Sequence, residues 1–127
     1  MDFTIPPEEL SIPGAIERVR AICLALPQAV EKPFGGHTDP AFRVLDKIFA
    51  IISRPFEHVS LTCKGGSGAQ DILIHSDPER YFSPPYTGHK GWVGVRLDIP
   101  IDWDIVEDII RDSYKMTAPK RLANLVT

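Results

Sequence analysis

Cysteines are few in this chain, and long apolar runs are absent. Its two cysteines, Cys23 and Cys63, lie far apart and form no C-x-x-C pair, so the zinc and thioredoxin-type motifs have no support and buried free thiols are expected. No apolar run approaches the roughly 20 residues of a membrane span. Met1 to Leu10 contains no basic residue, unlike the start of a signal peptide. We therefore expect a cytoplasmic protein with reduced thiols and no membrane association.

Positive charge is also in deficit. The 127 residues include 17 acidic and 14 basic side chains, for a net charge of −3, whereas a dedicated polyanion-binding protein is more often basic. Hydrophobic residues make up 43% and charged residues 24% of the chain, which is typical of one soluble globular domain. Composition alone therefore leans mildly against a nucleic-acid ligand.

Apolar periodicity predicts the order helix, three strands, helix, two strands, helix and a short helical tail. Helices are expected over 13–25 and 69–75, and a third follows Asp102 as its N-cap. Alternating or continuous apolar runs predict strands, namely 41–45, 48–53, 58–64, 80–86 and 92–98. A hairpin turn is expected at Asp46–Lys47. Residues 1–12 should form an extended N-terminal arm, and 13–127 a single domain.

This order predicts an α+β fold with two layers, in which helices cover one side of an antiparallel sheet. The inward positions of the elements should be buried: Ile16, Val19, Cys23, Ile48, Ala50, Val59, Leu61, Val93, Val95, Val106 and Ile110. The last strand carries Gly94 on its other face, and a glycine inside a strand often marks a close neighbour.

No pattern typical of catalysis or metal binding stands out. The four histidines, His37, His58, His75 and His89, lack the spacing of a zinc-binding helix. The GGSG loop at 65–68 lacks the Lys-Ser or Lys-Thr that completes a phosphate-binding loop. We therefore expect no catalytic residues, no metal and no cofactor, and a protein that is not an enzyme.

The stretch from Arg80 to Arg96 mixes cations with aromatic rings and contains no acidic residue. Its rings are Tyr81, Phe82, Tyr86 and Trp92. Such mixing suits nucleic acid, since cations meet phosphates and rings stack on bases. The alternative is that the rings fill the core and the cations are ordinary surface charges.

The segment SPPYTGHKGWVGVRLD at 83–98 resembles the MmcQ/YjbR family of small bacterial proteins. The family's pattern is found here at Pro84, Pro85, Tyr86, Gly88, His89, Gly91 and Trp92, and further similar stretches extend from about residue 15 to 125. The resemblance implies an α-β3-α-β2-α fold, also likened to secretion chaperones, and these motif residues are expected to have a structural role. The family is commonly described as DNA-binding, through a likeness to double-wing domains.

Two functions follow as hypotheses. The first is a non-enzymatic, weakly sequence-selective protein that binds double-stranded DNA, contacting phosphates through the open sheet face and the C-terminal region. The expected contacts are Arg43, Lys47, Lys90, Arg96, Lys115, Lys120 and Arg121. The alternative is a protein- or peptide-binding module of secretion-chaperone-like fold. Basic residues gathered on one concave face would favour DNA, and an exposed apolar patch would favour a protein partner. A monomer is expected in either case.

Overall fold

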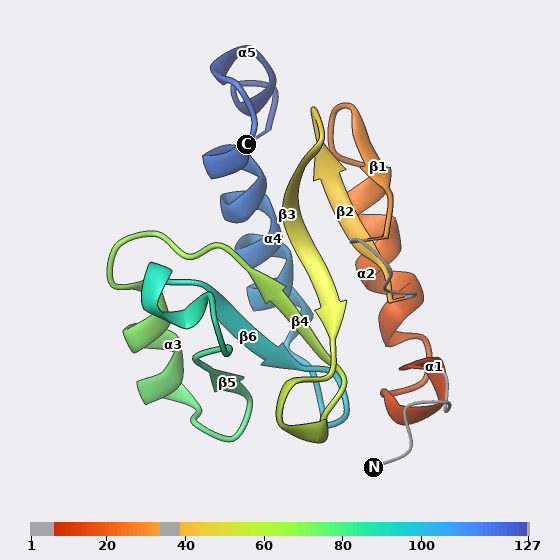
Figure 1. Ribbon diagram of the computed structural model, residues 1–127, viewed down its shortest axis with the longest axis vertical. Coiled ribbons are helices and arrows are strands. Elements are labelled where there is room, and N and C mark those ends of the chain that lie inside the picture. The colour runs from red at the N-terminus through yellow and green to blue at the C-terminus, as the bar shows by residue number, and fades with distance from the viewer. Residues whose placement is uncertain (1–6, 34–38, 127) are drawn as a thin grey trace.

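The computed structural model describes residues 7–33 and 39–126, and it contains an antiparallel sheet with helices packed on one side (Figure 1). The sheet has the strand order β1-β2-β3-β4-β6-β5. Its strands are β1 Ala29–Glu31, β2 Ala41–Val44, β3 Lys47–Ser53, β4 Ser60–Cys63, β5 Tyr81–Phe82 and β6 Val93–Arg96. The predicted α+β class is therefore confirmed.

Two long helices, α2 and α4, pack on the same face of the sheet, and the core lies between them and the strands (Figure 1). The helices are α1 Pro7–Leu10, α2 Ala15–Leu24, α3 Ala69–Ser76, α4 Trp103–Thr117 and α5 Lys120–Ala123, with short 3₁₀ turns η1 Pro55–Glu57 and η2 Gly88–Lys90. Asp102 caps α4 as predicted, because its carboxylate accepts a hydrogen bond from the Ile105 amide. The α3 helix contacts β5 at the edge of the sheet.

The structure adds a strand that periodicity did not predict. Strand β1 pairs with β2, joining Ala29 to Val44 and Glu31 to Phe42. It has three residues, of which Val30 and Glu31 are exposed. A strand this short at a sheet edge carries too little alternation to be recognised in the sequence.

Three predicted boundaries are wrong. The β2–β3 turn is at Leu45 and Asp46, whose φ values of 47° and 68° fit a type I′ hairpin, and Lys47 already pairs with Val44. Pro7–Leu10 is helical instead of extended; residues 1–6 lie outside the described part, as do 34–38 of the predicted loop. The strand predicted at 80–86 is limited to Tyr81–Phe82, because prolines follow that cannot donate to a sheet.

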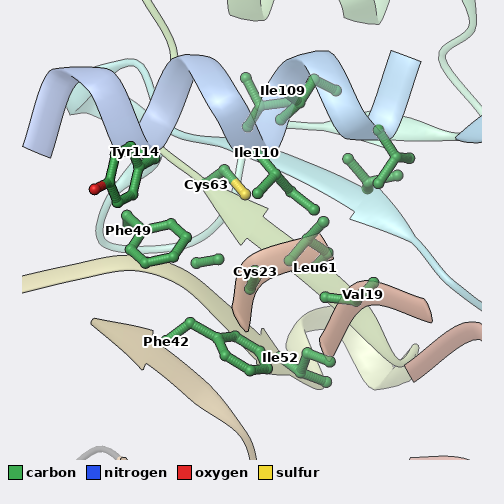
Figure 2. Packing of buried hydrophobic residues seen from close by; sticks show 14 of the residues in the cluster. Val19, Cys23, Phe42, Phe49, Ile52, Leu61, Cys63, Ile109, Ile110 and Tyr114 are labelled. Carbon is green, nitrogen blue, oxygen red and sulfur yellow. The ribbon is translucent and has the colours of Figure 1, made fainter. Parts of the chain in front are cut away.

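The predicted core is correct at ten of its eleven positions, and Figure 2 shows part of it beneath α4. Cys23 and Cys63 are buried free thiols, as expected. Burial raises the pKa of both, so neither is a reactive thiolate at neutral pH. The exception is Ile48, which is only half-buried and lies on the opposite face of the sheet.

A β-bulge explains the position of Ile48. Phe42 pairs with Ala50, but the next residue, Arg43, pairs with Ile48. Phe49 is therefore the extra residue on β3, and the alternation of side chains reverses there. Phe49 and Ala50 are both fully buried, and the Phe49 ring packs edge-on against Tyr114 with 5.4 Å between ring centroids.

The hydroxyl group of Ser113 on α4 closes the sheet beside this bulge. Ala50 pairs with Cys63, so the next pair along the ladder would be Phe49 with Lys64. The Ser113 hydroxyl bridges those two residues instead, accepting from the Lys64 amide at 2.9 Å and donating to the Phe49 carbonyl at 2.5 Å. One buried side chain thus satisfies two backbone groups and fixes α4 against the sheet.

Replacing Ser113 with alanine should lower the free energy of unfolding by about 1–3 kcal/mol, because a buried amide and a buried carbonyl lose their partner. Chemical denaturation measures this change. Ser76→Ala is the matched control, since the Ser76 hydroxyl donates to Leu73 in an exposed position, and it should change stability by less than about 0.5 kcal/mol. Equal effects of the two substitutions would contradict the role given to Ser113.

Gly94 is required because the ring of Phe82 lies directly on it, as a strand glycine predicts. A Cβ atom at Gly94 would lie 2.3–2.7 Å from three ring carbons of Phe82. Gly94→Ala should therefore destabilise the protein by about 1–3 kcal/mol through overpacking. Gly66→Ala serves as the control, because a Cβ atom there would meet nothing within 4 Å. A Gly94→Ala variant as stable as wild type would show that the ring is free to move away.

Candidate functional site

The face of the sheet opposite the helices is hollowed into a cavity of about 1150 Å³. Its described lining combines cations, aromatic rings, prolines and aliphatic side chains with two carboxylates. These residues are Asp39, Arg43, Asp46, Lys47, Ile48, Ile51, Ser53, Arg54, Pro55, Thr62, Lys64, Pro84, Pro85, Tyr86, Thr87 and Trp92. We call this the open-face cavity.

The floor of the open-face cavity follows from strand alternation. Ile51 pairs with Thr62, and both point away from the core because their neighbours Ile52 and Leu61 are fully buried. Lys64 follows buried Cys63 and Trp92 precedes buried Val93, which places both on the open face. The bulge adds Ile48 to this floor, so the departure from regular alternation helps to build the site.

The cavity is locally basic although the protein is acidic. Its described lining holds four cations, Arg43, Lys47, Arg54 and Lys64, against the carboxylates of Asp39 and Asp46. The net charge of the whole chain is −3. Neither Lys47 nor Lys64 makes an ion pair with another described residue. Their ammonium groups are available to an anionic ligand.

Arg54 is the cation that the sequence did not single out, because it stands between Ser53 and Pro55 at the predicted strand end. Its side chain is only 8% exposed, and its nearest carboxylate oxygen is Asp39 Oδ1, 3.8 Å from Nη2. Nε and Nη1 are buried and have no hydrogen-bond partner among the described residues. A guanidinium that is both buried and incompletely paired is costly, so its place at the cavity calls for an explanation.

Arg43, by contrast, has its donors engaged. Its guanidinium donates to the backbone carbonyls of Lys32, Pro33 and Asp46, each at 3.3 Å. The Asp46 carboxylate lies 3.7 Å from Nη1. Arg43 therefore ties the β2–β3 turn to the segment after β1, with each of its three guanidinium nitrogens hydrogen-bonded to backbone, and it adds positive charge to the cavity.

Four aromatic side chains lie on or beside the open face. Trp92 is half-buried in the cavity lining, and Tyr86 at its rim is 92% exposed. Phe82 covers Gly94, and Phe56, which is 62% exposed, packs edge-on against Phe82 at 5.8 Å between centroids. Of the rings in the basic stretch, Tyr81 alone is fully buried in the core, so core filling does not account for the others.

Tyr86 and Phe56 also hold an unusual backbone conformation. Their φ values are 69° and 54°, in the left-handed region that bulky residues rarely adopt. Such a residue costs about 1–3 kcal/mol unless its surroundings impose the conformation. Both residues lie in tight turns, in which the Thr87 amide donates to the Pro85 carbonyl at 2.8 Å and the His58 amide to the Pro55 carbonyl at 3.3 Å. Residues in such conformations cluster at functional sites.

The glycines of the family-like motif shape this segment. A Cβ atom at Gly88 would overlap Ser83, and Gly91 ends η2 with a φ of 89°. Gln70 on α3 donates from its amide to the carbonyls of Gly88 and Trp92, at 2.9 and 2.7 Å. His89 is exposed. The motif thus divides into the glycines, which shape the loop, and Pro84, Pro85, Tyr86 and Trp92, which line the cavity.

The structure brings together two of the seven predicted phosphate contacts, Arg43 and Lys47, at the open-face cavity. Arg96 is on the open face but forms a two-bond pair with Asp98, at 2.9 Å for each bond. This pairing lowers the pKa of the Asp98 carboxyl, so the charges compensate each other. Lys90 lies on η2 beside the GGSG loop. Lys115, Lys120 and Arg121 belong to α4 and α5, in the helical layer.

Neither a metal cluster nor a membrane span is found in the described ranges. Among these residues, no three His, Cys, Asp or Glu side chains come together to hold an ion. No described helix has the length and apolar character needed to cross a bilayer.

Comparison with known proteins identifies the family. A solved structure with this fold is the crystal structure of the Deinococcus radiodurans protein DR2400, a DUF419 domain, with a TM-score of 0.72 and 19% sequence identity over 94% of this chain and 89% of that one. A search of curated protein sequences finds no match. The sequence model of the YjbR family matches residues 24–116, so the chain belongs to the YjbR family.

Proposed function

We propose that this protein binds single-stranded nucleic acid, DNA in the first instance, on its open sheet face and catalyses no reaction. The observation that carries this proposal is that half-buried Trp92 lines one cavity with Lys47 and Lys64, which make no ion pair with any described residue. Lysine ammonium groups neutralise backbone phosphates, and an accessible ring offers a stacking platform to bases of any sequence.

A single strand fits this surface better than a duplex does. The rings of Trp92 and Tyr86 can stack only on bases that are unstacked from their neighbours. In a duplex the faces of the bases are covered, and a protein reaches only phosphates and base edges. The proposal keeps DNA as the ligand, as the family resemblance implies, but it replaces the double-stranded DNA expected from the sequence with a single strand.

The net charge of −3 does not oppose this function. Local potential governs the encounter with a polyanion, and a chain that is acidic overall can present a basic site. The acidic first turns of α4, which contain Asp104 and Asp108, belong to the helical layer. The sheet thus separates the acidic helix from the open-face cations.

A protein or peptide partner is the second candidate, and the exposed rings of Phe56 and Tyr86 favour it. Aromatic side chains are enriched at protein interfaces as well as at nucleic-acid sites. The two candidates differ in their dependence on salt, since phosphate contacts release counterions and apolar contacts do not.

Replacing Lys47 and Lys64 together with glutamate should weaken the binding of a single-stranded oligonucleotide. The slope of log K against log salt should fall in magnitude by about 1.4, since each phosphate contact on a single strand contributes about 0.7. The measurement is quenching of Trp92 fluorescence in a Trp103→Phe background, which leaves Trp92 as the one tryptophan of the chain's two. Trp103 lies in the helical layer, with Arg18 4.7 Å from its ring centroid.

The matched control is Lys120→Glu combined with Arg121→Glu on α5, which makes the same change in net charge. This control should keep the wild-type salt slope if the open face is the interface. If only the α5 variant has a smaller salt slope than wild type, the interface includes the C-terminal cations and not the open face. If wild-type protein binds no single-stranded oligonucleotide at low salt, the proposed function is wrong and a protein partner is favoured.

A further inference from the structure

We infer that the Arg54 end of the open-face cavity binds a terminal phosphate monoester, so that the protein recognises the end of a nucleic-acid strand. The inference rests on the proposed function and adds the kind of ligand that fills the site. It is carried by the burial of Arg54, by its unpaired donors and by its position at one end of the cavity.

The guanidinium of Arg54 needs acceptors that the described residues do not supply. Nε and Nη1 have no hydrogen-bond partner in the part of the chain that the structure describes, and the Asp39 carboxylate lies 3.8 Å from Nη2, beyond hydrogen-bond distance. The planar guanidinium presents five donors in a geometry that matches phosphate oxygens. A phosphate at this end of the cavity would satisfy Nε and Nη1 with charge-assisted hydrogen bonds.

The depth of the site selects a terminal phosphate over an internal one. The Arg54 side chain is 8% exposed and that of Arg43 is 14% exposed, whereas Lys47 at the other end of β3 is exposed. A phosphodiester inside a strand carries a nucleoside on each side, so the chain must pass through the place where it binds. A monoester carries one substituent and can end against a buried cation. It also carries about −1.5 to −2 charges near pH 7.

The length of the cavity requires more than one nucleotide. Strand β3 runs along it from Ile48 to Ser53, which corresponds to about 16 Å at the rise of a β-strand. Arg54 follows Ser53. Lys64 and Trp92 lie at the other end, because Ala50 pairs with Cys63 and Cys63 with Val93. The backbone positions of Arg54 and Trp92 are thus about five residues apart along the strands, a separation that suits the end of a strand better than a mononucleotide.

The experiment compares four probes in the Trp103→Phe background: one short single-stranded oligonucleotide with a 5′-phosphate, the same strand with a 3′-phosphate, the strand with neither, and a mononucleotide. One of the phosphorylated strands should bind about tenfold or more tightly than the unphosphorylated strand, the difference expected of added charge-assisted hydrogen bonds. Arg54→Gln should abolish that preference while the unphosphorylated strand still binds. Arg111→Gln, on the exposed side of α4, should keep the full preference.

Each other outcome overturns a different statement. If all three strands bind wild-type protein equally, recognition of a terminal phosphate is wrong and the proposed function still holds. If no strand binds, the proposed function itself is wrong. A mononucleotide that binds as tightly as the phosphorylated strand would make the ligand a free nucleotide. If Arg54→Gln does not fold, Arg54→Lys decides, because it keeps the charge and loses the forked geometry. An unchanged preference in Arg54→Lys would overturn the assignment to Arg54.

Discussion

The bulge in β3, together with the hydroxyl of Ser113 beside it, is the constraint on which both layers of this structure depend. One extra residue lets Phe49 and Ala50 both enter the core, and it turns Ile48 to the open face. The bulge interrupts the regular pairing of β3 with β2. On the other side of β3, Ser113 of α4 extends the pairing with β4 by bridging Lys64 and Phe49. The same helix that covers the core therefore also fixes the backbone from which Lys64 enters the open-face cavity.

The sheet separates two chemical environments. On the helix side, apolar side chains pack around α2 and α4 with both thiols buried among them. On the other side, one cavity is lined by two lysines that make no ion pair with a described residue, by exposed rings and by an incompletely paired arginine. Proteins rarely keep a buried, incompletely paired guanidinium or a bulky residue with positive φ without a reason. Both kinds of feature are found at this cavity, which is why we assign function to it and not to the α5 cations.

Sequence patterns predicted the fold better than the site. Alternation correctly predicted that Leu61, Val93 and Val95 are buried, because regular strands have a period of two. The open-face positions of Thr62, Lys64 and Trp92 follow from the same rule. The same rule gave the wrong face for Ile48, because the sequence of β3 contains no pattern that identifies the β-bulge at Phe49. Arg54 was missed because it precedes a proline and looks like a strand end; its burial depends on residues distant in sequence. Lys115, Lys120 and Arg121 were grouped with Arg43 by charge alone, and sequence could not show that the sheet divides them.

The central claim is that the open face, and not the helical layer, is where nucleic acid binds. The most direct test is a titration of ¹⁵N-labelled protein with a single-stranded oligonucleotide, followed by amide and indole chemical shifts. We predict that the amide shifts of Lys47, Ile51, Arg54 and Thr62 and the indole shift of Trp92 change. The amide shifts of α4 and α5 should remain unchanged. Shifts confined to α4 and α5, or spectra that do not change at low salt, would contradict it.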